Sequence, residues 1–259
     1  MTDRCDGERS QRSASETDAP RASSPTTDAS PATLASRLLE SVRREQPTAS
    51  HREALATVDE SALDRVRTDR RTALTFWLNV YNAAAQLLLE RRPDLFDSRW
   101  RFFRTTAITV AGVDLSLDDI EHGLMRDSRS KYGLGYLPRL ARTGFGADYR
   151  LDPDPRIHFA LNCGAASCPA ILSYDRDSVD RTLDDATASH LDRAVTYDAD
   201  RGRVHVPRLC LWYIGDFGGP AGLRAFLRYH GQLPPESNPS LRFTDYDWTK
   251  VPRKFAGEQ

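Results

Sequence analysis

The sequence has no long apolar run. No stretch of its 259 residues approaches the roughly 18 consecutive apolar residues that a membrane-spanning helix needs. The first thirty residues contain no hydrophobic segment that resembles a secretion signal. We therefore expect no membrane as a partner and a cytoplasmic location.

The sequence also lacks an excess of charge of either sign, and it is poor in cysteine. Thirty-six Lys and Arg residues against 37 Asp and Glu residues leave a formal net charge of −1. This balance gives no electrostatic reason to expect nucleic acid as a partner. Four cysteines, Cys5, Cys163, Cys168 and Cys210, are too few for a disulfide scaffold, and a cytoplasmic setting would keep them reduced.

Several motifs that indicate familiar chemistry are missing. The sequence contains no Walker loop, dinucleotide fingerprint, HExxH or GxSxG pattern. Nucleotide-dependent enzymes, dehydrogenases, zinc proteases of the HExxH type and serine hydrolases therefore lose their usual support. We predict no cofactor and no metal, and, for an enzyme, a small-molecule or peptide substrate.

The chain is predicted to consist of a disordered polar tail, residues 1–30, and a single globular domain, residues 31–259. The tail has almost nothing to bury, and it carries Cys5 as an exposed thiol. In the domain, apolar residues at helical spacing predict helices over 34–42, 55–66, 72–92, 120–125, 178–195 and 219–229. Alternating patterns predict a β-hairpin over 108–115 and strands over 157–161, 204–211 and 241–248.

Helices dominate the N-terminal part, and the strands are short and scattered. This order favours the α+β class, with a helical N-terminal part packed on a small, mostly antiparallel sheet. Ser116, followed three residues later by the carboxylate of Asp119, predicts a capping box at the start of the helix over 120–125. Cys210 is flanked by apolar residues and is predicted to lie in the core.

The helix over 72–92 is apolar almost all round, yet it carries a polar stripe. Asn79, Asn82 and Gln86 are spaced three and four residues apart and therefore share one face. A helix of this kind is normally buried, and buried amides must find hydrogen-bond partners. The stripe either binds the backbone of a neighbouring loop or lines a functional site.

The segment 157–169 carries the residues that most strongly suggest chemistry. A predicted strand with His158 leads into a turn of small residues that holds Cys163 and Cys168. A cysteine nucleophile needs a lowered pKa, which a histidine or a helix N-terminus can supply. Pro169 is suited to the first position of a helix and would place Cys168 at its cap. Two structural cysteines, a local disulfide and zinc ligation remain as alternatives.

Geometry limits the pairing of these residues. In an unbroken strand His158 and Cys163 would lie on opposite faces, about 16 Å apart, so a turn near Asn162 is required for contact. Glu121 and His122 offer a carboxylate and a second imidazole on one helix, but helical neighbours point about 100° apart. We expect only one of these two to face a site, and a solvent-exposed Glu121 is the simpler alternative.

Five motifs together resemble a known family. They are Phe76 to Ala83 (FWLNVYNA), Leu117 to His122 (LDDIEH), Ile157 to Gly164 (IHFALNCG) with Ser167-Cys168-Pro169, Trp212-Tyr213 before Asp216-Phe217, and Tyr246-Asp247-Trp248. In this order they resemble the domain of unknown function 547 family over roughly residues 60–250. Where that family tends to end in Trp-x-Leu-Asn, this chain has Trp248-Thr249-Lys250-Val251.

The resemblance implies a site rather than a reaction. The matching positions look like the constellation of a cysteine hydrolase of the papain or transglutaminase sort. In that interpretation Cys163 attacks an amide or thioester-like carbonyl, His158 moves the proton, and Glu121 orients the imidazole. Cys168 is the alternative nucleophile. Asn79 or Asn82 would donate to the oxyanion or position the substrate.

The rival hypothesis is a non-catalytic interaction or scaffold module. In that case the same polar residues form a buried hydrogen-bond network that fixes one arrangement of the core. It predicts thiols with an ordinary or raised pKa and a loss of folding when Asn79 or His158 is replaced.

Overall fold

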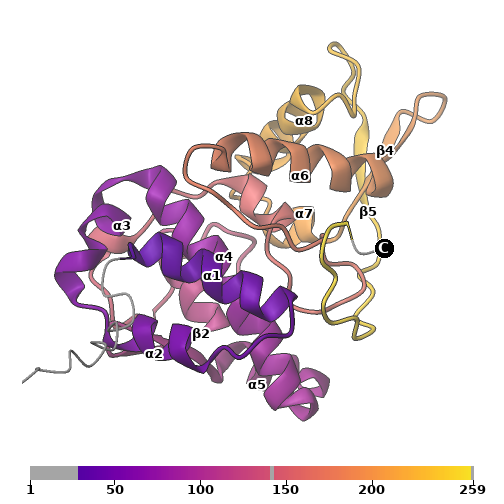
Figure 1. The fold of residues 1–259 in the computed structure, drawn as a ribbon. Helices are drawn as coiled ribbons and strands as arrows, with labels where there is room; N and C mark the ends of the chain where they lie inside the picture. Colours follow the sequence, from indigo (N-terminus) through magenta and orange to yellow (C-terminus); the bar gives the residue numbers. More distant parts are fainter. Residues whose placement is uncertain (1–28, 141–142, 258–259) are drawn as a thin grey trace, which may run out of the picture.

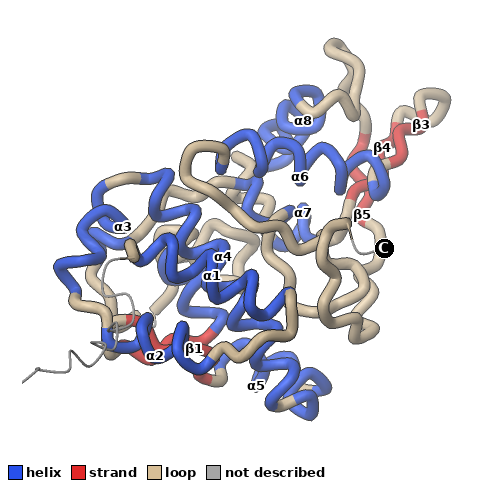
Figure 2. Tube along the Cα trace, viewed as in Figure 1, coloured by secondary structure: helices blue, strands red, loops and turns tan. Residues whose placement is uncertain are grey.

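The computed structural model describes residues 29–140 and 143–257, and it has an α+β fold. The predicted tail, with Cys5, lies outside these residues except for positions 29 and 30. In Figure 1 the N-terminal helices α1 to α5 form one half of the molecule, and α6, α7, α8 and the strands β3 to β5 form the other. The helix and strand assignments are coloured in Figure 2.

The N-terminal half is built around one long buried helix. Its helices are α1 (Pro31–Arg43), α2 (Ala49–Thr57), α3 (Asp64–Thr68), α4 (Arg70–Arg91) and α5 (Arg99–Arg104), with short 3-10 turns η1 (Glu60–Leu63) and η2 (Pro93–Asp97). Asp69 caps α4 by accepting a hydrogen bond from the Thr72 N–H group. Helix α4 is buried from Thr72 to Leu89, as its all-round apolar pattern predicts.

The helix predicted over 55–66 is wrong as a single element. Helix α2 ends at Thr57 because Val58 takes up an extended conformation, and the chain re-enters a helix only through η1. The apolar residues of this stretch, Leu55, Leu63 and Val66, are nevertheless buried. Their common periodicity therefore reflects a shared core face rather than a continuous helix.

The predicted hairpin is confirmed. Strands β1 (Thr106–Val110) and β2 (Val113–Ser116) pair antiparallel across a turn at Ala111 and Gly112, both with positive φ. The predicted capping box is also confirmed, since the Ser116 N–H group donates to the Asp119 carboxylate and the Asp119 N–H group donates to the Ser116 hydroxyl. The helix that follows is a π-helical turn, η3 (Asp119–Leu124).

The C-terminal half combines three helices with a small mixed sheet. Its elements are the 3-10 turns η4 (Ala147–Tyr149) and η5 (Pro155–Phe159), the helices α6 (Val179–Ala194), α7 (Leu209–Trp212) and α8 (Gly219–Tyr229), and the strands β3 (Thr196–Asp198), β4 (Arg203–Val206) and β5 (Ser240–Phe243). Strand β4 is central, antiparallel to β3 and parallel to β5. Helices α6 and α8 match the predictions over 178–195 and 219–229.

Three predicted strands need correction. Residues 155–159 form the 3-10 turn η5, because Pro155 occupies the first position and the Asp154 carboxylate caps the N–H group of Arg156. Residues 209–212 form helix α7, and the terminal strand extends only over β5. In each case a short apolar run fits both a strand and a buried turn.

Two apolar clusters form the core. The first surrounds α4 and contains Cys163 and Cys168 at its margin, and the second joins α6, α7, α8 and β4 around Phe159 and contains Cys210, as predicted. No helix in the described part of the chain is long and apolar enough to cross a membrane.

Candidate functional site

The turn that carries His158 is fixed by buried charge. The Arg156 guanidinium donates to the carboxylate of Asp154 within η5 and to that of Asp180 on α6. This network ties the turn to the long helix behind it. His158 therefore starts from a rigid support, although it lies on a 3-10 turn rather than on the predicted strand.

Asn82 of α4 holds the chain between His158 and the cysteines. Its amide donates to the carbonyl of Ala160 at 3.1 Å, and its carbonyl accepts from the Asn162 N–H group at 2.9 Å. The Asn162 side chain then accepts from the Gly164 N–H group at 2.8 Å, which closes a turn. The bend that the sequence required near Asn162 is therefore present.

Asn79 has a similar role one turn earlier on α4. Its amide donates to the Tyr174 carbonyl, and its carbonyl accepts from the Tyr174 N–H group. Asn79 and Asn82 are both fully buried, and their amides bind backbone groups, with one further bond from Asn79 to the Ser36 hydroxyl. Of the two interpretations of the polar stripe, the structure supports binding of loop backbone, and these amides are not placed to bind an oxyanion.

The turn brings the two thiols together. The sulfur atoms of Cys163 and Cys168 are 3.3 Å apart, and the Cys168 sulfur also accepts from the Cys163 N–H group at 3.3 Å. The hydroxyl of Tyr246 lies 3.3 Å from the same sulfur. Within the described residues three donors therefore surround the Cys168 sulfur, and two of them belong to Cys163.

These contacts separate the acidities of the two thiols. Burial alone would raise the pKa of Cys168, but the hydrogen bonds from Cys163 and Tyr246 outweigh it and lower that pKa. The hydrogen bond to Cys168, together with burial, raises the pKa of Cys163. Cys168 is therefore the thiolate of the pair, and Cys163 keeps its proton and donates it.

A C-terminal segment covers the thiol turn. The Ala166 N–H group donates to the carbonyl of Thr249, and the Val251 N–H group donates to the carbonyl of Gly164. This pairing fixes the position of Tyr246 over Cys168. Trp248, two residues on, packs against Tyr246 with ring centroids 4.6 Å apart and the ring planes tilted by 50°.

His158 is paired with a carboxylate that sequence reasoning did not assign. Its Nε2 atom lies 2.9 Å from Asp216, which also accepts two hydrogen bonds from the fully buried Arg126. The imidazole stacks on the ring of Tyr213 at 3.9 Å. The predicted pairing of His158 with Glu121 is therefore not found. Within the described residues no hydrogen bond joins His158 to either thiol.

The charges of this pair are settled by burial and by neighbours. Burial lowers the pKa of His158, partly opposed by the hydrogen bond that its ring donates to Asp216, so the ring is neutral. Burial would raise the pKa of Asp216, but His158 and Arg126 together lower it to about 2. Because Nε2 faces the carboxylate, it carries the ring proton, and Nδ1 is left as the basic nitrogen.

Glu121 and His122 both reach the interior from the π-helical turn η3. The Tyr81 hydroxyl donates to the Glu121 carboxylate at 3.4 Å, and burial raises the pKa of Glu121 to about 7 against the opposing charge of Arg126. The Arg126 guanidinium donates to Nδ1 of His122 at 2.8 Å. Contrary to expectation, the two neighbours line the same cavity, and π-helical turns are frequent at functional sites.

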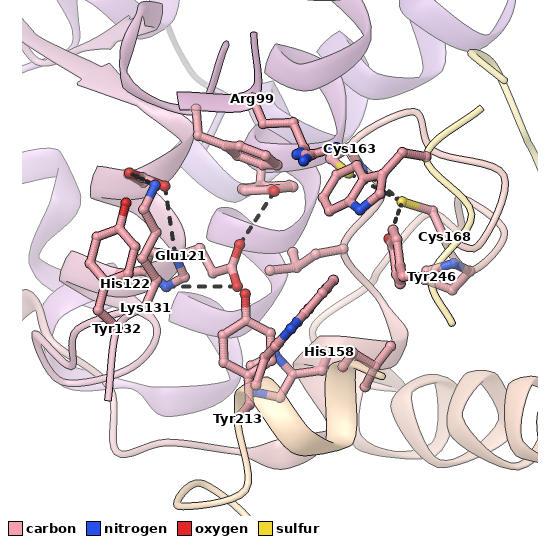
Figure 3. A pocket seen from close by; sticks show the side chains of 18 of the residues that line it. Arg99, Glu121, His122, Lys131, Tyr132, His158, Cys163, Cys168, Tyr213 and Tyr246 are labelled. Atoms are coloured by element: carbon pink, nitrogen blue, oxygen red, sulfur yellow. Dashed lines mark hydrogen bonds and ion pairs between the residues drawn. The ribbon is translucent and has the colours of Figure 1, made fainter. Parts of the chain in front are cut away.

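One cavity of about 390 Å³ (Figure 3) adjoins the thiol turn, although Asp216 and Arg126 are not among its lining residues. His158, Cys163, Cys168 and Glu121 line it, so the structure brings the predicted catalytic residues together, with Cys163 and Cys168 at one end in the view. Asn79 and Asn82 are not among its lining residues. Its wall is mainly aromatic, formed by Tyr81, Trp100, Phe103, Tyr132, Trp212, Tyr213, Tyr246 and Trp248.

Sequence reasoning missed three contributors. Asp216 and Tyr246 belong to motifs of the resemblance, but nothing in their spacing tied them to His158 or Cys168. Arg126 had no signal, because an arginine among many gives no sign that it is buried. Within the described residues, no group of three or more His, Cys, Asp or Glu side chains is arranged to hold a metal ion.

Comparison with known proteins gives one match. Residues 66–191 match the model of a family described as "Protein of unknown function, DUF547". No curated protein and no solved structure matches the chain. The matched range includes His158, both buried thiols of the turn and Glu121, and it ends before Asp216 and Tyr246.

Proposed function

Because the chain belongs to the DUF547 family, whose description names no activity, we propose a function from the site itself. The protein is a thiol-dependent hydrolase or acyl transferase that acts on an amide or thioester-like carbonyl. The nucleophile is Cys168, and the substrate is a small molecule or a peptide. A reducing compartment such as the cytoplasm keeps its thiols active.

One observation carries this proposal. The Cys168 sulfur is surrounded by three donors, the Cys163 thiol, the Cys163 N–H group and the Tyr246 hydroxyl, each at 3.3 Å. Hydrogen bonds to the charged form lower a thiol's pKa, and the thiolate is the nucleophile. Cys168 therefore needs no neighbouring base for its activation, which fits the absence of a hydrogen bond to His158.

His158 has a separate task in this proposal. The Cys168 thiolate attacks the carbonyl carbon, a sulfur–carbon bond forms, and the leaving group departs with the electrons of its bond. Water or an acceptor then attacks the acyl carbon while Nδ1 of His158 takes its proton, and the bond between that carbon and the Cys168 sulfur breaks, which restores the thiolate. The departed leaving group takes its proton from solvent, to which the imidazole returns the proton it gained. Asp216 holds the tautomer that leaves Nδ1 free, as the acid of a triad does.

Glu121 contributes in its neutral form. With a pKa of about 7 it is largely protonated below neutral pH. The Tyr81 hydroxyl, 3.4 Å away, and the Tyr213 hydroxyl, which lies beside Glu121 in Figure 3, donate to the carboxyl group, whose own proton remains as a hydrogen-bond donor inside an aromatic cavity. Donors in such a setting stabilise negative charge that develops on a substrate oxygen.

The scaffold hypothesis has one observation in its favour. Asn79 and Asn82 form the buried backbone-binding network that it requires. However, that network supports the turn from behind and does not involve Cys168, Tyr246 or Asp216. A scaffold has no need for a thiolate that faces a cavity, so we favour the enzyme.

The test is trapping of an acyl group. The purified protein is mixed with S-phenyl thioacetate, thiophenol release is followed, and the acetylated residue is identified by peptide mass mapping. We expect an acetyl group on Cys168 and no turnover by Cys168→Ala. Cys210→Ala, which alters a buried thiol in the other apolar cluster, is the matched control and keeps the activity.

Two results would contradict the proposal. Wild-type turnover by a folded Cys168→Ala variant would remove the thiol from the mechanism. An acetyl group on Cys163 would move the attack to that residue. Thermal unfolding of each variant separates loss of chemistry from loss of folding.

A further inference from the structure

A second cavity, of about 180 Å³, lies next to the thiol turn. Cys168 and Tyr246 belong to its wall as well as to the wall of the aromatic cavity. The rest of its lining comes from Ala166, Ser167, the end of helix α6, the loop after β4, Asp245 and Lys254. The proposed nucleophile therefore stands where two cavities of different character adjoin.

The second cavity is rich in positive charge. Arg193, Arg208 and Lys254 line it, against the single carboxylate of Asp245. Arg208 is paired with Asp245 at 2.7 Å. Within the described residues Arg193 donates only to the hydroxyl of Ser189 and has no ion-pair partner. Two cations thus remain without a carboxylate.

Lys254 is held at the base of the thiol turn. Its ammonium group donates to the carbonyl of Cys168 at 2.7 Å and to that of Ala166 at 3.0 Å. An ammonium group has three donors, and these two bonds use two of them. The charge is therefore fixed in place beside the nucleophile, with one donor left over.

His190 gives the second cavity an unpartnered polar group. Only 9% of its surface is exposed, and within the described residues its ring makes no hydrogen bond, lying instead against Phe159. Burial, and then the charges of Arg193 and Lys254, lower its pKa to about 4. Its ring nitrogens are not among the fully enclosed polar atoms of the described residues, so a ligand in the cavity can reach them.

We propose that the second cavity binds an anionic group, a phosphate or a carboxylate, on the leaving group of the acyl substrate. The inference rests on the proposed function and names its substrate class. The acyl part lies in the aromatic cavity, and Arg193, Lys254 and His190 bind the anion. Substrates of this class are thioesters whose thiol portion carries a phosphate or a carboxylate, and phosphate is used as the probe.

The chemical step is unchanged by this placement. The Cys168 thiolate forms a bond to the carbonyl carbon, and the carbon–sulfur bond of the substrate breaks. The phosphate-bearing thiol leaves as its thiolate. Its negative charge departs toward the cationic cavity, while the acyl group stays in the aromatic one.

The test compares two thioesters with the same acetyl group. One has a neutral thiol portion, pantetheine, and the other has phosphopantetheine, which differs from it only by a terminal phosphate. We expect kcat/KM to favour the phosphorylated thioester by about tenfold or more, since hydrogen bonds to charged groups are strong. Arg193→Leu should reduce that preference to about twofold or less.

A matched control comes from the same helix. Arg181 of α6 is exposed and makes no hydrogen bond or ion pair within the described residues. Arg181→Leu removes the same charge and should keep the full preference. Equal kcat/KM for the two thioesters in the wild type would overturn the inference, and so would an undiminished preference in Arg193→Leu.

A binding measurement separates this inference from the proposed function. Inorganic phosphate is added to the inactive Cys168→Ala variant while the His190 ring resonances are titrated by NMR. A bound anion offsets the charges of Arg193 and Lys254, so the pKa of His190 should rise. A His190 pKa that phosphate does not move would overturn the anion site, whether or not the protein turns over thioesters.

Discussion

Replacing Glu121 by Gln is expected to stabilise the protein at pH 8 and to have much less effect at pH 5. Glu121 is buried beneath the aromatic cavity, and burial raises its pKa from 4.5 to about 7. The ionised carboxylate is thus less favourable in the folded protein than in the unfolded chain. The glutamine keeps the shape and an oxygen that can accept from Tyr81 but cannot ionise.

The magnitude follows from the two pKa values. Below pH 4.5 the carboxyl is neutral in both states and costs nothing. As the pH rises through 7, the folded state must either ionise a buried group or hold a proton that the unfolded chain has released. A rise from 4.5 to about 7 corresponds to roughly 3 kcal/mol above pH 7, most of which develops between pH 5 and pH 8.

The assay is thermal or urea unfolding of the wild type and of Glu121→Gln from pH 5 to pH 8. At pH 8 the melting temperature of the variant should be higher by about 5–10 °C. Glu53→Gln, at an exposed position on α2, removes the same charge and should show no such dependence. A difference between Glu121→Gln and wild type that stays constant with pH would refute a buried, neutral Glu121.

Three further changes test the rest of the site. Tyr246→Phe removes one donor to Cys168 and should raise the pH midpoint of Cys168 labelling by iodoacetamide by about one unit, and an unchanged midpoint would deny the hydroxyl this role. Asn82→Ala leaves buried backbone groups unpaired and should lower the free energy of unfolding in urea by about 3 kcal/mol. A decrease below about 1 kcal/mol would contradict the role of Asn82 in holding the backbone between His158 and the cysteines. Hydrogen peroxide should oxidise Cys163 and Cys168 to a disulfide with release of water. The intact mass of the protein should fall by two hydrogens, and dithiothreitol should reverse the change. Persistence of both free thiols would count against their close approach.

The elements that periodicity predicted best are those with one continuous buried face. Helix α4 matches its prediction because its apolar pattern, the Asp69 cap and the stop at Pro93 all agree. The hairpin β1–β2 is a local structure, and its turn is formed by two adjacent residues, Ala111 and Gly112. Such features need no information from distant parts of the chain.

The site was predicted only in part, because its pairings join distant segments. The residue types near His158 and Cys168 suggested thiol chemistry, and both side chains do line one cavity. Their partners, Asp216 and Tyr246, lie 58 and 78 residues away along the chain. Only the packing of the two halves decides that Asp216, and not Glu121, reaches the imidazole.

The C-terminal segment that covers the thiol turn is synthesised after the turn itself, so the surroundings of Cys168 are completed late during synthesis. The hydrogen bond from Asp247 to Ser167 spans 80 residues of sequence. During synthesis the turn with Cys168 leaves the ribosome well before Tyr246 exists to donate to its sulfur. Until then the thiol lacks a donor that lowers its pKa, so in the growing chain it is mostly protonated at neutral pH. The low pKa of Cys168 is therefore acquired only when the segment with Tyr246 has folded back over the turn.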